Sequence, residues 1–235
     1  MENKNKIGII EGGNLYQLDF LKDLRFEKIL TSYGDAFYYS YHSIPFILRH
    51  GPERNILPHT INHQANIFVF KKMGIKKVFA FNSVGSLTKR IKPGMFLIPH
   101  DYINFDSETC LKQERRHIIP EISQEARNDL INISKKLKLL FKSKGIYFQT
   151  KGPRYETKKE VKIIKKFAQV VGMTMGKEAT LAKEMEIKYA SICCIDNYAN
   201  GVIKESLTQE EIEKHDKEMI KTVSKIVQEI LRISL

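Results

Sequence analysis

Arg49 and His50 are adjacent residues that could bind an anion, directly after an apolar segment at residues 44–48. An arginine side chain presents a planar cation with five donors, and a histidine adds a group that titrates near neutral pH. This pair suits a dianionic phosphate group. The alternative is an ordinary surface ion pair beside a loop histidine. The residue types alone leave both interpretations open.

Two further segments carry groups that could contact the same anion. Gly12 and Gly13 follow the first apolar segment, residues 6–10, where backbone N–H groups could approach an anion closely. An ordinary glycine turn is the alternative. Thr174 follows the apolar segment 170–172 and offers a hydroxyl, although a threonine there also suits the N-cap of the next helix. Each signal is weak when taken alone.

A carboxylate and a polar pair could recognise a flat ligand with hydrogen-bonding edges. Glu156 follows Tyr155, so its carboxylate could accept N–H donors from a base on which the ring packs. The alternative is that Glu156 only favours the N-terminus of the following helix. Asp196 and Asn197 end the apolar segment 189–195, where a buried acid is costly unless it is paired. A simple turn is the alternative there.

Alternating strand and helix patterns must position these residues. Short apolar segments between turn residues indicate strands, and apolar residues recurring every three or four positions indicate helices. We expect strands at 6–10, 36–41, 44–48, 78–81, 95–98, 146–149, 170–172 and 189–195. We expect helices at 60–73, 124–142, 158–168, 178–185 and 208–232, the last with a capping box of Thr208 and Glu211. The pattern predicts a single α/β domain over residues 1–235, with a mixed, largely parallel central sheet flanked by helices.

Polar or glycine clusters follow several of the expected strands. They lie at residues 12–14, 49–51, 82–83, 172–174 and 196–197. In α/β sheets the ligand binds in the crevice at the carboxyl ends of the strands. We therefore expect these clusters to surround one site.

Composition argues against several classes of protein. The chain has 235 residues, of which 42% are hydrophobic, and its 39 Lys and Arg against 27 Asp and Glu give a net charge of +12. The basic residues are spread along the chain, without zinc-finger spacing or an aromatic RNA-binding motif, so we expect no nucleic-acid partner. The apolar segments are far shorter than the roughly 20 residues that span a bilayer, so we expect no membrane segment.

The cysteines and the first residues indicate a reducing cytoplasm. Cys110, Cys193 and Cys194 form no disulfide framework, and the adjacent pair lies in an apolar segment. The chain does not begin with a basic region followed by an apolar stretch, so we expect no secretory signal. The sequence shows no metal-ligand spacing and no dinucleotide-binding fingerprint, so we expect no metal site.

Several segments, taken in order, resemble the trimeric purine nucleoside phosphorylase and methylthioadenosine phosphorylase family over nearly the whole chain. They include Arg49-His50-Gly51, residues 82–87, Gly152-Pro153-Arg154-Tyr155-Glu156-Thr157, residues 171–174 and Asn197-Tyr198. The resemblance implies the nucleoside phosphorylase fold and a reaction in which phosphate cleaves a purine nucleoside to free purine and ribose 1-phosphate. It implies no cofactor, since phosphate is a co-substrate, and a homotrimer or a hexamer of two trimers.

The resemblance also implies roles for individual residues. Phosphate would be held by Gly13, Arg49, His50, Thr174 and the backbone around Ser83. The nucleoside would contact Tyr155, Glu156, the Met173 backbone, Asn197 and, near its 5′ position, Gln209. Asn197 would donate to purine N7 as the glycosidic bond breaks, with Asp196 protonated or orienting it.

Glu156 favours recognition of a 6-oxopurine base. An ionised carboxylate accepts from N1–H of hypoxanthine or guanine, whereas N1 of adenine is itself an acceptor, and such a buried mismatch discriminates by about 10⁴-fold. The adenine-cleaving branch usually carries Ser there, and aspartates where this chain has Asn197 and Ala199. We therefore expect phosphorolysis of 6-oxopurine nucleosides in purine salvage.

Two alternatives remain open. One is a 5′-methylthioinosine or 5′-methylthioadenosine phosphorylase, because Gln209 could either bond a 5′-hydroxyl or pack along a thioether. The other is a non-catalytic nucleoside-binding relative, because Gly13 stands where the family carries a phosphate-binding Ser or Thr. Glu11 adds negative charge nearby, and Lys177 replaces the family's proline.

Overall fold

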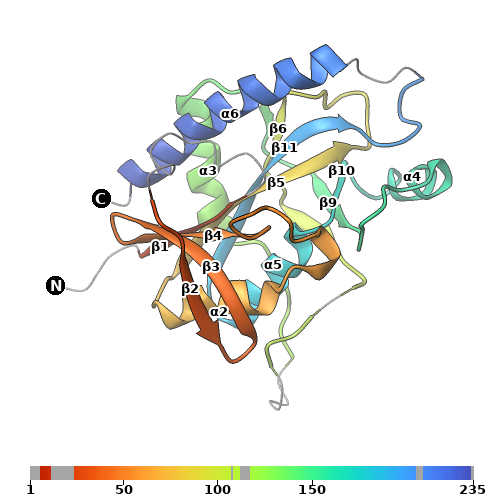
Figure 1. The fold of residues 1–235 in the computed structure, drawn as a ribbon. Helices are drawn as coiled ribbons and strands as arrows, with labels where there is room; N and C mark the ends of the chain where they lie inside the picture. The colour runs from red at the N-terminus through yellow and green to blue at the C-terminus, as the bar shows by residue number, and fades with distance from the viewer. Residues whose placement is uncertain (1–5, 12–23, 107, 112–116, 205–208, 234–235) are drawn as a thin grey trace.

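A computed structural model describes residues 6–11, 24–106, 108–111, 117–204 and 209–233 (Figure 1). In this part of the chain eleven strands join one sheet. Figure 1 shows α6 (Gln209–Arg232) and α3 (Gln124–Lys136) on one side of the sheet, and α2 (His63–Lys72) and α5 (Met175–Glu184) on the other. The short helix α4 (Lys158–Ile164) lies at one end. The predicted α/β class is confirmed.

Parallel strands form the centre of the sheet. β5 (Lys77–Ser86) lies between β1 (Ile7–Glu11) and β11 (Lys188–Tyr198) and pairs in parallel with both. Phe79 of β5 and Ile192 of β11 are fully buried. A parallel sheet needs helices on both faces, which explains why these strands are apolar on both sides. All three strands therefore end at the same edge.

An antiparallel meander forms one end of the sheet. It consists of β2 (Glu27–Thr31), β3 (Gly34–Tyr41) and β4 (Ile44–Leu48). The turn between β3 and β4 has two residues, His42 and Ser43, both with positive φ, which is typical of tight hairpins. β4 then pairs in parallel with β1, so the chain leaves β4 at the edge where β1, β5 and β11 also end.

Shorter strands complete the sheet. β10 (Val170–Gly172) pairs antiparallel with the end of β5, and β9 (Ile146–Gln149) and β7 (Asp101–Ile103) follow in parallel. β6 (Phe96–Leu97) pairs antiparallel with β11 and parallel with β8 (Phe141–Lys142). The mixed, largely parallel sheet is thus confirmed.

Two strands continue well past their predicted ends. The strand expected at 78–81 continues to Ser86, and the one expected at 189–195 continues to Tyr198. Their polar ends pair with each other, Asn197 with Gly85 and Tyr198 with Ser86. The polar side chains at 196–197 were also compatible with a turn. Backbone hydrogen bonds instead continue the pairing of β5 with β11 through this segment. The strand expected at 95–98 covers only Phe96–Leu97, and the strands β2, β7 and β8 were not predicted.

The helix predicted at 124–142 is wrong beyond Lys136. α3 ends at Lys136, and Lys138 adopts a left-handed φ of 52°. The N–H groups of Lys138 and Leu139 donate to the carbonyls of Lys135 and Ser134, which closes the helix end as a Schellman motif. Glycine usually occupies the left-handed position, so a lysine there gave no signal. Residues 141–142 form β8 instead.

Other helix boundaries shift by a few residues. The helix expected at 60–73 begins at His63, because the Asn62 side chain caps the Ala65 N–H and Pro58–Thr60 forms a 3-10 turn. The helix expected at 158–168 ends at Ile164. The helix expected at 178–185 is Met175–Glu184. The capping box predicted at Thr208 lies outside the described residues.

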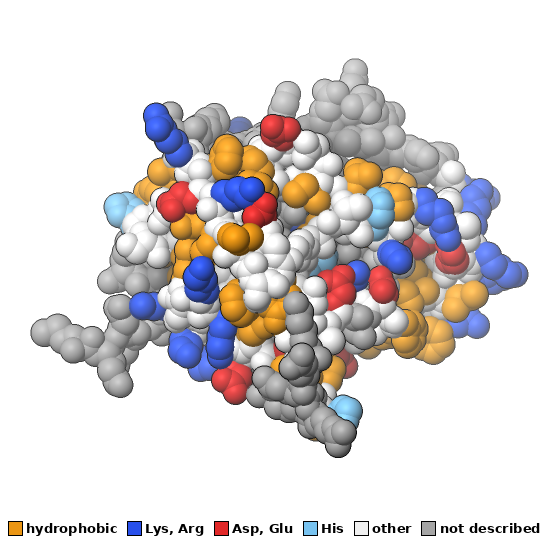
Figure 2. Space-filling model, turned by 60° about the horizontal axis from the view of Figure 1, so that its bottom comes forward, with side chains coloured by type: hydrophobic (Ala, Val, Ile, Leu, Met, Phe, Trp, Pro, Cys, Tyr) orange, Lys and Arg blue, Asp and Glu red, His pale blue; other side chains and the backbone are white. Residues whose placement is uncertain are grey.

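The described surface carries mixed charges. Figure 2 shows Lys and Arg side chains scattered among apolar and acidic side chains on this face, without one continuous basic patch. In the described part of the chain no helix is both long and apolar enough to cross a bilayer.

Candidate active site

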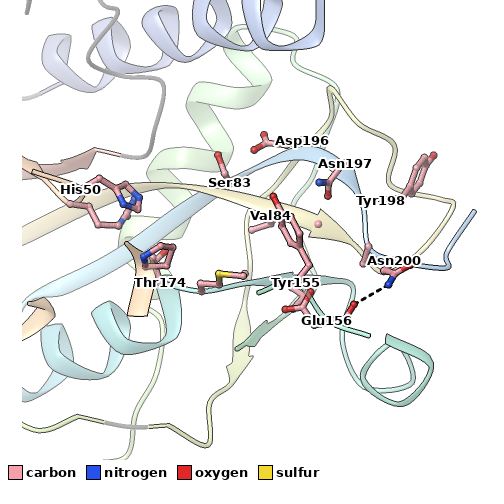
Figure 3. A pocket seen from close by; sticks show the side chains of 17 residues that line it. His50, Ser83, Val84, Tyr155, Glu156, Thr174, Asp196, Asn197, Tyr198 and Asn200 are labelled. Carbon is pink, nitrogen blue, oxygen red and sulfur yellow. Dashed lines mark hydrogen bonds between the residues drawn. The ribbon is translucent and has the colours of Figure 1, made fainter. Parts of the chain in front are cut away.

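One cavity of about 440 Å³ lies at the edge where β4, β5, β10 and β11 end (Figure 3). It brings together nine of the residues that the sequence singled out: Arg49, His50, Ser83, Tyr155, Glu156, Met173, Thr174, Asp196 and Asn197. In Figure 3, His50 and Thr174 lie at one end of the cavity, and Tyr155, Glu156 and Asn197 lie at the other. Gly13 lies outside the described residues, as does the side chain of Gln209 at the start of α6.

Arg49 is buried, with 2% of its surface exposed, so the alternative of a surface ion pair is wrong. Its Nε and Nη2 donate to the two carboxylate oxygens of Glu178 at 2.5 and 3.0 Å, and Nη1 donates to the Phe81 carbonyl at 2.9 Å. The Tyr189 hydroxyl also donates to Glu178, at 2.8 Å. The guanidinium is therefore fixed in place on the cavity wall.

Glu178 belongs to the segments that carry the family resemblance, but the sequence assigned it no role in the site. Burial acts to raise the pKa of its carboxyl, but the Arg49 charge and hydrogen bonds outweigh burial, and the net shift is downward. Glu178 therefore stays ionised and balances the charge of Arg49. The two residues are 129 positions apart, so no local pattern could have joined them.

His50 has its tautomer set by the backbone. Its Nδ1 lies 2.8 Å from the Ile56 carbonyl oxygen, which can only accept, so Nδ1 carries the hydrogen. Burial, followed by the nearby Arg49 charge, lowers the pKa of His50. The neutral ring then offers Nε2 as an acceptor at the anion end of the cavity.

Thr174 lies at the N-cap position of α5, but its side chain makes no capping hydrogen bond to that helix. Its Oγ1 instead accepts from Nδ2 of Asn82 at 2.7 Å, and Oδ1 of Asn82 accepts from the Ser191 hydroxyl at 2.5 Å. Because Oγ1 is used as an acceptor, its hydrogen can point to a ligand. The arrangement favours the anion-binding interpretation of Thr174 over the capping one.

Glu156 is buried, with 8% of its surface exposed, and does not serve the N-terminus of α4. Thr157 and Glu160 form the capping box of that helix. The Glu156 carboxylate instead lines the cavity, where its Oε1 accepts from the Thr150 hydroxyl at 2.7 Å. Tyr155 is 75% exposed, and its ring extends across the cavity towards the ends of β5 and β11 (Figure 3).

Asp196 and Asn197 lie inside β11 and not in a turn. The register shifts between Ile195 and Asn197, so the ladder to β5 skips Asp196. Such a bulge turns the side chains of the bulged strand to a new direction. Asp196 and Asn197 are both half-buried and both line the cavity. A Cβ at position 85 would lie 3.2 Å from Oδ1 of Asn197, so Gly85 leaves room for the amide.

Among the described residues no group of three or more His, Cys, Asp or Glu side chains could hold a metal ion. The three cysteines are buried and free. Burial raises the pKa of the Cys193 and Cys194 thiols far above the neutral range, so both remain protonated. The two adjacent cysteines therefore fill space in the core.

Comparison with known proteins identifies the family. The sequence pattern of the phosphorylase superfamily matches residues 8–232. This chain belongs to the phosphorylase superfamily. It is 38% identical over 232 residues to the probable 6-oxopurine nucleoside phosphorylase of Archaeoglobus fulgidus, covering 96% of each chain. It is 40% identical over 233 residues to the probable S-methyl-5′-thioinosine phosphorylase of Methanocaldococcus jannaschii, covering 96% of this chain and 91% of that one.

The fold agrees with that of a solved methylthioadenosine phosphorylase. Methylthioadenosine phosphorylase from Schistosoma mansoni, in complex with tubercidin, superimposes with a TM-score of 0.83 at 20% identity. The match covers 98% of this chain and 92% of that chain. At this identity the likeness establishes the shared fold alone.

Proposed function

We propose that this phosphorylase-superfamily chain cleaves purine nucleosides with inorganic phosphate and prefers 6-oxopurines. The observation that carries the proposal is the cavity itself, which has cationic and hydroxyl groups at one end and a buried carboxylate with an amide at the other. The names of the Archaeoglobus and Methanocaldococcus relatives support the same reaction class.

Phosphate occupies the end of the cavity formed by Arg49, His50 and Thr174. The Arg49 guanidinium, held by Glu178, lines this end, and the Thr174 hydroxyl donates a hydrogen bond. His50 offers Nε2 as an acceptor, which suits the O–H of hydrogen phosphate. The backbone around Ser83 lies on the same wall and completes the proposed phosphate site.

The purine occupies the other end. The Glu156 carboxylate accepts N1–H of a 6-oxopurine, and Tyr155 packs on the ring. Asn197 donates to N7, with Asp196 orienting it. The Met173 backbone faces the ribose hydroxyls between the two ends.

The reaction is a displacement at the sugar. A phosphate oxygen forms a bond to C1′ while the C1′–N9 bond breaks and its electron pair moves into the purine. In the net reaction the hydrogen of hydrogen phosphate ends on the purine, which gives neutral purine and ribose 1-phosphate. Bound phosphate stabilises the positive charge that develops on the sugar, and Asn197 stabilises the negative charge on the purine. Phosphate is the co-substrate, and the proposed steps use no cofactor.

The test is a substrate panel with and without phosphate. Inosine, guanosine, 5′-methylthioinosine and 5′-methylthioadenosine are each incubated with the purified chain, and release of free base is measured. We expect phosphate-dependent release of hypoxanthine and guanine, with methylthioadenosine cleaved more slowly by about 10²-fold or more. Faster cleavage of methylthioadenosine than of all three 6-oxopurine nucleosides would contradict the base preference. Failure to release any base would favour the non-catalytic alternative.

A second candidate is a 5′-methylthioinosine phosphorylase, which is favoured by the 40% identity to a relative of that name. Both candidates use the same purine and phosphate ends. They differ at the 5′ position, where Gln209 is the proposed contact. The ratio of kcat/KM for inosine and for 5′-methylthioinosine distinguishes them.

We also propose that the chain acts as one domain and assembles as a homotrimer or hexamer. Its described strands form one sheet, which supports a single domain. Phe105 is 88% exposed and stacks edge-on against Phe148, which lines a hollow with the exposed Ile163. Glu156 lines both this hollow and the candidate active site, so an apolar surface adjoins the site. A second copy of the chain would bury it.

A further inference from the structure

Thr150 holds the carboxylate of Glu156 from behind the cavity. It follows β9 directly and is absent from the residues that line the cavity. Its hydroxyl oxygen lies 2.7 Å from Oε1 of Glu156. Its backbone N–H donates to the Gly172 carbonyl at 2.8 Å, which ties it to the end of β10. The hydroxyl is thus presented from a rigid part of the sheet.

The hydroxyl has one hydrogen and two acceptors in reach. The Gly172 carbonyl oxygen is 3.5 Å away and already accepts the Thr150 N–H, whereas Oε1 of Glu156 is 2.7 Å away. The hydrogen therefore goes to the carboxylate, which when ionised can only accept. Oε1 is bonded to Thr150, whereas Oε2 accepts no hydrogen bond from the described residues, so Oε2 is the oxygen that we assign to a ligand.

Glu156 is also held through its backbone. Nδ2 of Asn200 donates to the Glu156 carbonyl at 3.2 Å, as the dashed line in Figure 3 shows. Asn200 follows β11, and Thr150 follows β9, so two separate parts of the sheet edge fix one residue. The side chain can change its direction only by losing the Thr150 contact.

The Glu156 carboxylate could also turn towards a second hollow. Glu156 and Thr150 both line this hollow of about 380 Å³, together with Lys151, Arg154 and Glu160. Arg154 is paired there with Glu160 at 2.8 Å, which leaves Lys151 as the cation nearest in sequence to Thr150. Without the Thr150 hydroxyl, the charge of Lys151 would draw the carboxylate away from the first cavity. The geometry points to Thr150 as a positioning residue that aims Oε2 of Glu156 at N1–H of a 6-oxopurine and so sets base preference. This inference rests on the proposed function.

The experiment compares Thr150→Val, which keeps the shape but removes the hydroxyl, with Thr150→Ser, which keeps the hydroxyl. The readout is the ratio of kcat/KM for inosine to that for adenosine, with KM for phosphate measured alongside. Losing a hydrogen bond to a charged group corresponds to a loss of about tenfold to a hundredfold in kcat/KM. We expect Thr150→Val to lower the inosine-to-adenosine ratio by that factor. Only kcat/KM for inosine should fall, and KM for phosphate should stay unchanged. We expect Thr150→Ser to restore the ratio to within about threefold.

Two controls separate positioning from loss of structure. Thr222→Val makes the same chemical change on α6, where Thr222 donates only to the Glu218 carbonyl. It should leave the ratio unchanged. In a Glu156→Gln background, adding Thr150→Val should cause no further loss. If Thr150→Val does not fold, Thr150→Ala takes its place in both comparisons.

Several results would overturn the inference. One is a Thr150→Val variant that cleaves inosine with the wild-type ratio. Another is an equal loss for inosine and adenosine, which a structural role alone would cause. If the wild type releases no hypoxanthine, the proposed function fails, and calorimetry of hypoxanthine binding then tests Thr150 separately. Equal hypoxanthine affinity in the wild type and Thr150→Val, or no binding to either, would also overturn it.

Discussion

Asn197 shows how one side chain is aimed by its neighbours. The bulge before it changes the register of β11, and Gly85 opposite leaves room for its amide. Its Nδ2 is the group that we assign to N7 of the departing purine. Because charge on the purine develops only as the bond breaks, this hydrogen bond should act mainly on kcat.

At the scale of single residues, we predict that Asn197→Ala lowers kcat. Loss of one donor to a developing negative charge costs about 10²- to 10³-fold in kcat. The KM for phosphate should stay within a few-fold, because Asn197 lies at the opposite end of the cavity. Steady-state kinetics with inosine measure both quantities. Asn128→Ala, on the exposed face of α3, is the matched control, and an unchanged kcat in Asn197→Ala would refute the assignment.

At the scale of elements, helices α2 and α5 pack around a buried group of charges. His63, the first residue of α2, is 1% exposed, and its Nδ1 lies 3.8 Å from Oε1 of Glu178 on α5. Neither ring nitrogen has a hydrogen-bond partner among the described residues. Burial lowers the pKa of His63 to about 4, although Glu178 acts in the opposite direction. His63 is therefore neutral in the folded protein at pH 7.

This burial predicts a pH-dependent stability. Between pH 6.5 and 4 the unfolded chain binds a proton at position 63 that the folded chain does not, so the free energy of unfolding falls as the pH falls. Over this pH range, His63 lowers the free energy of unfolding by about 3 kcal/mol. We expect His63→Leu to flatten that part of the profile, and His117→Leu, at an exposed histidine, to leave it unchanged. Urea unfolding at pH 7 and pH 5 measures the difference. Equal slopes in the wild type and His63→Leu would rule the explanation out.

At the scale of the whole molecule, the apolar surface around Phe105, Phe148 and Ile163 adjoins the loop that carries Glu156. A charged substitution at an exposed position of this surface should weaken assembly but not folding. We predict that the wild type elutes as a trimer or hexamer in size-exclusion chromatography with light scattering. Phe105→Asp should shift it towards the monomer while the melting temperature of the chain changes little. A monomeric wild type would contradict the proposed assembly.

The sequence by itself determined the family and the residues that surround the site. Strands β4 and β9 have the predicted bounds, and nine predicted site residues line one cavity. These features are local, because a motif and a short apolar segment each lie within a few adjacent residues. The family assignment is confirmed, and the roles of the residues stay predictions.

Only the tertiary structure decided which groups these residues meet. Arg49 finds Glu178 across 129 positions, and the ends of β5 and β11 extend each other through pairing. The end of α3 depends on a left-handed lysine, and the direction of Glu156 depends on Thr150. The end of α3 is decided locally, by a left-handed residue that no glycine marks. The ion pair and the strand pairing share another physical reason. Burial, backbone pairing and hydrogen bonds join residues whose distance in space bears no fixed relation to their distance along the chain.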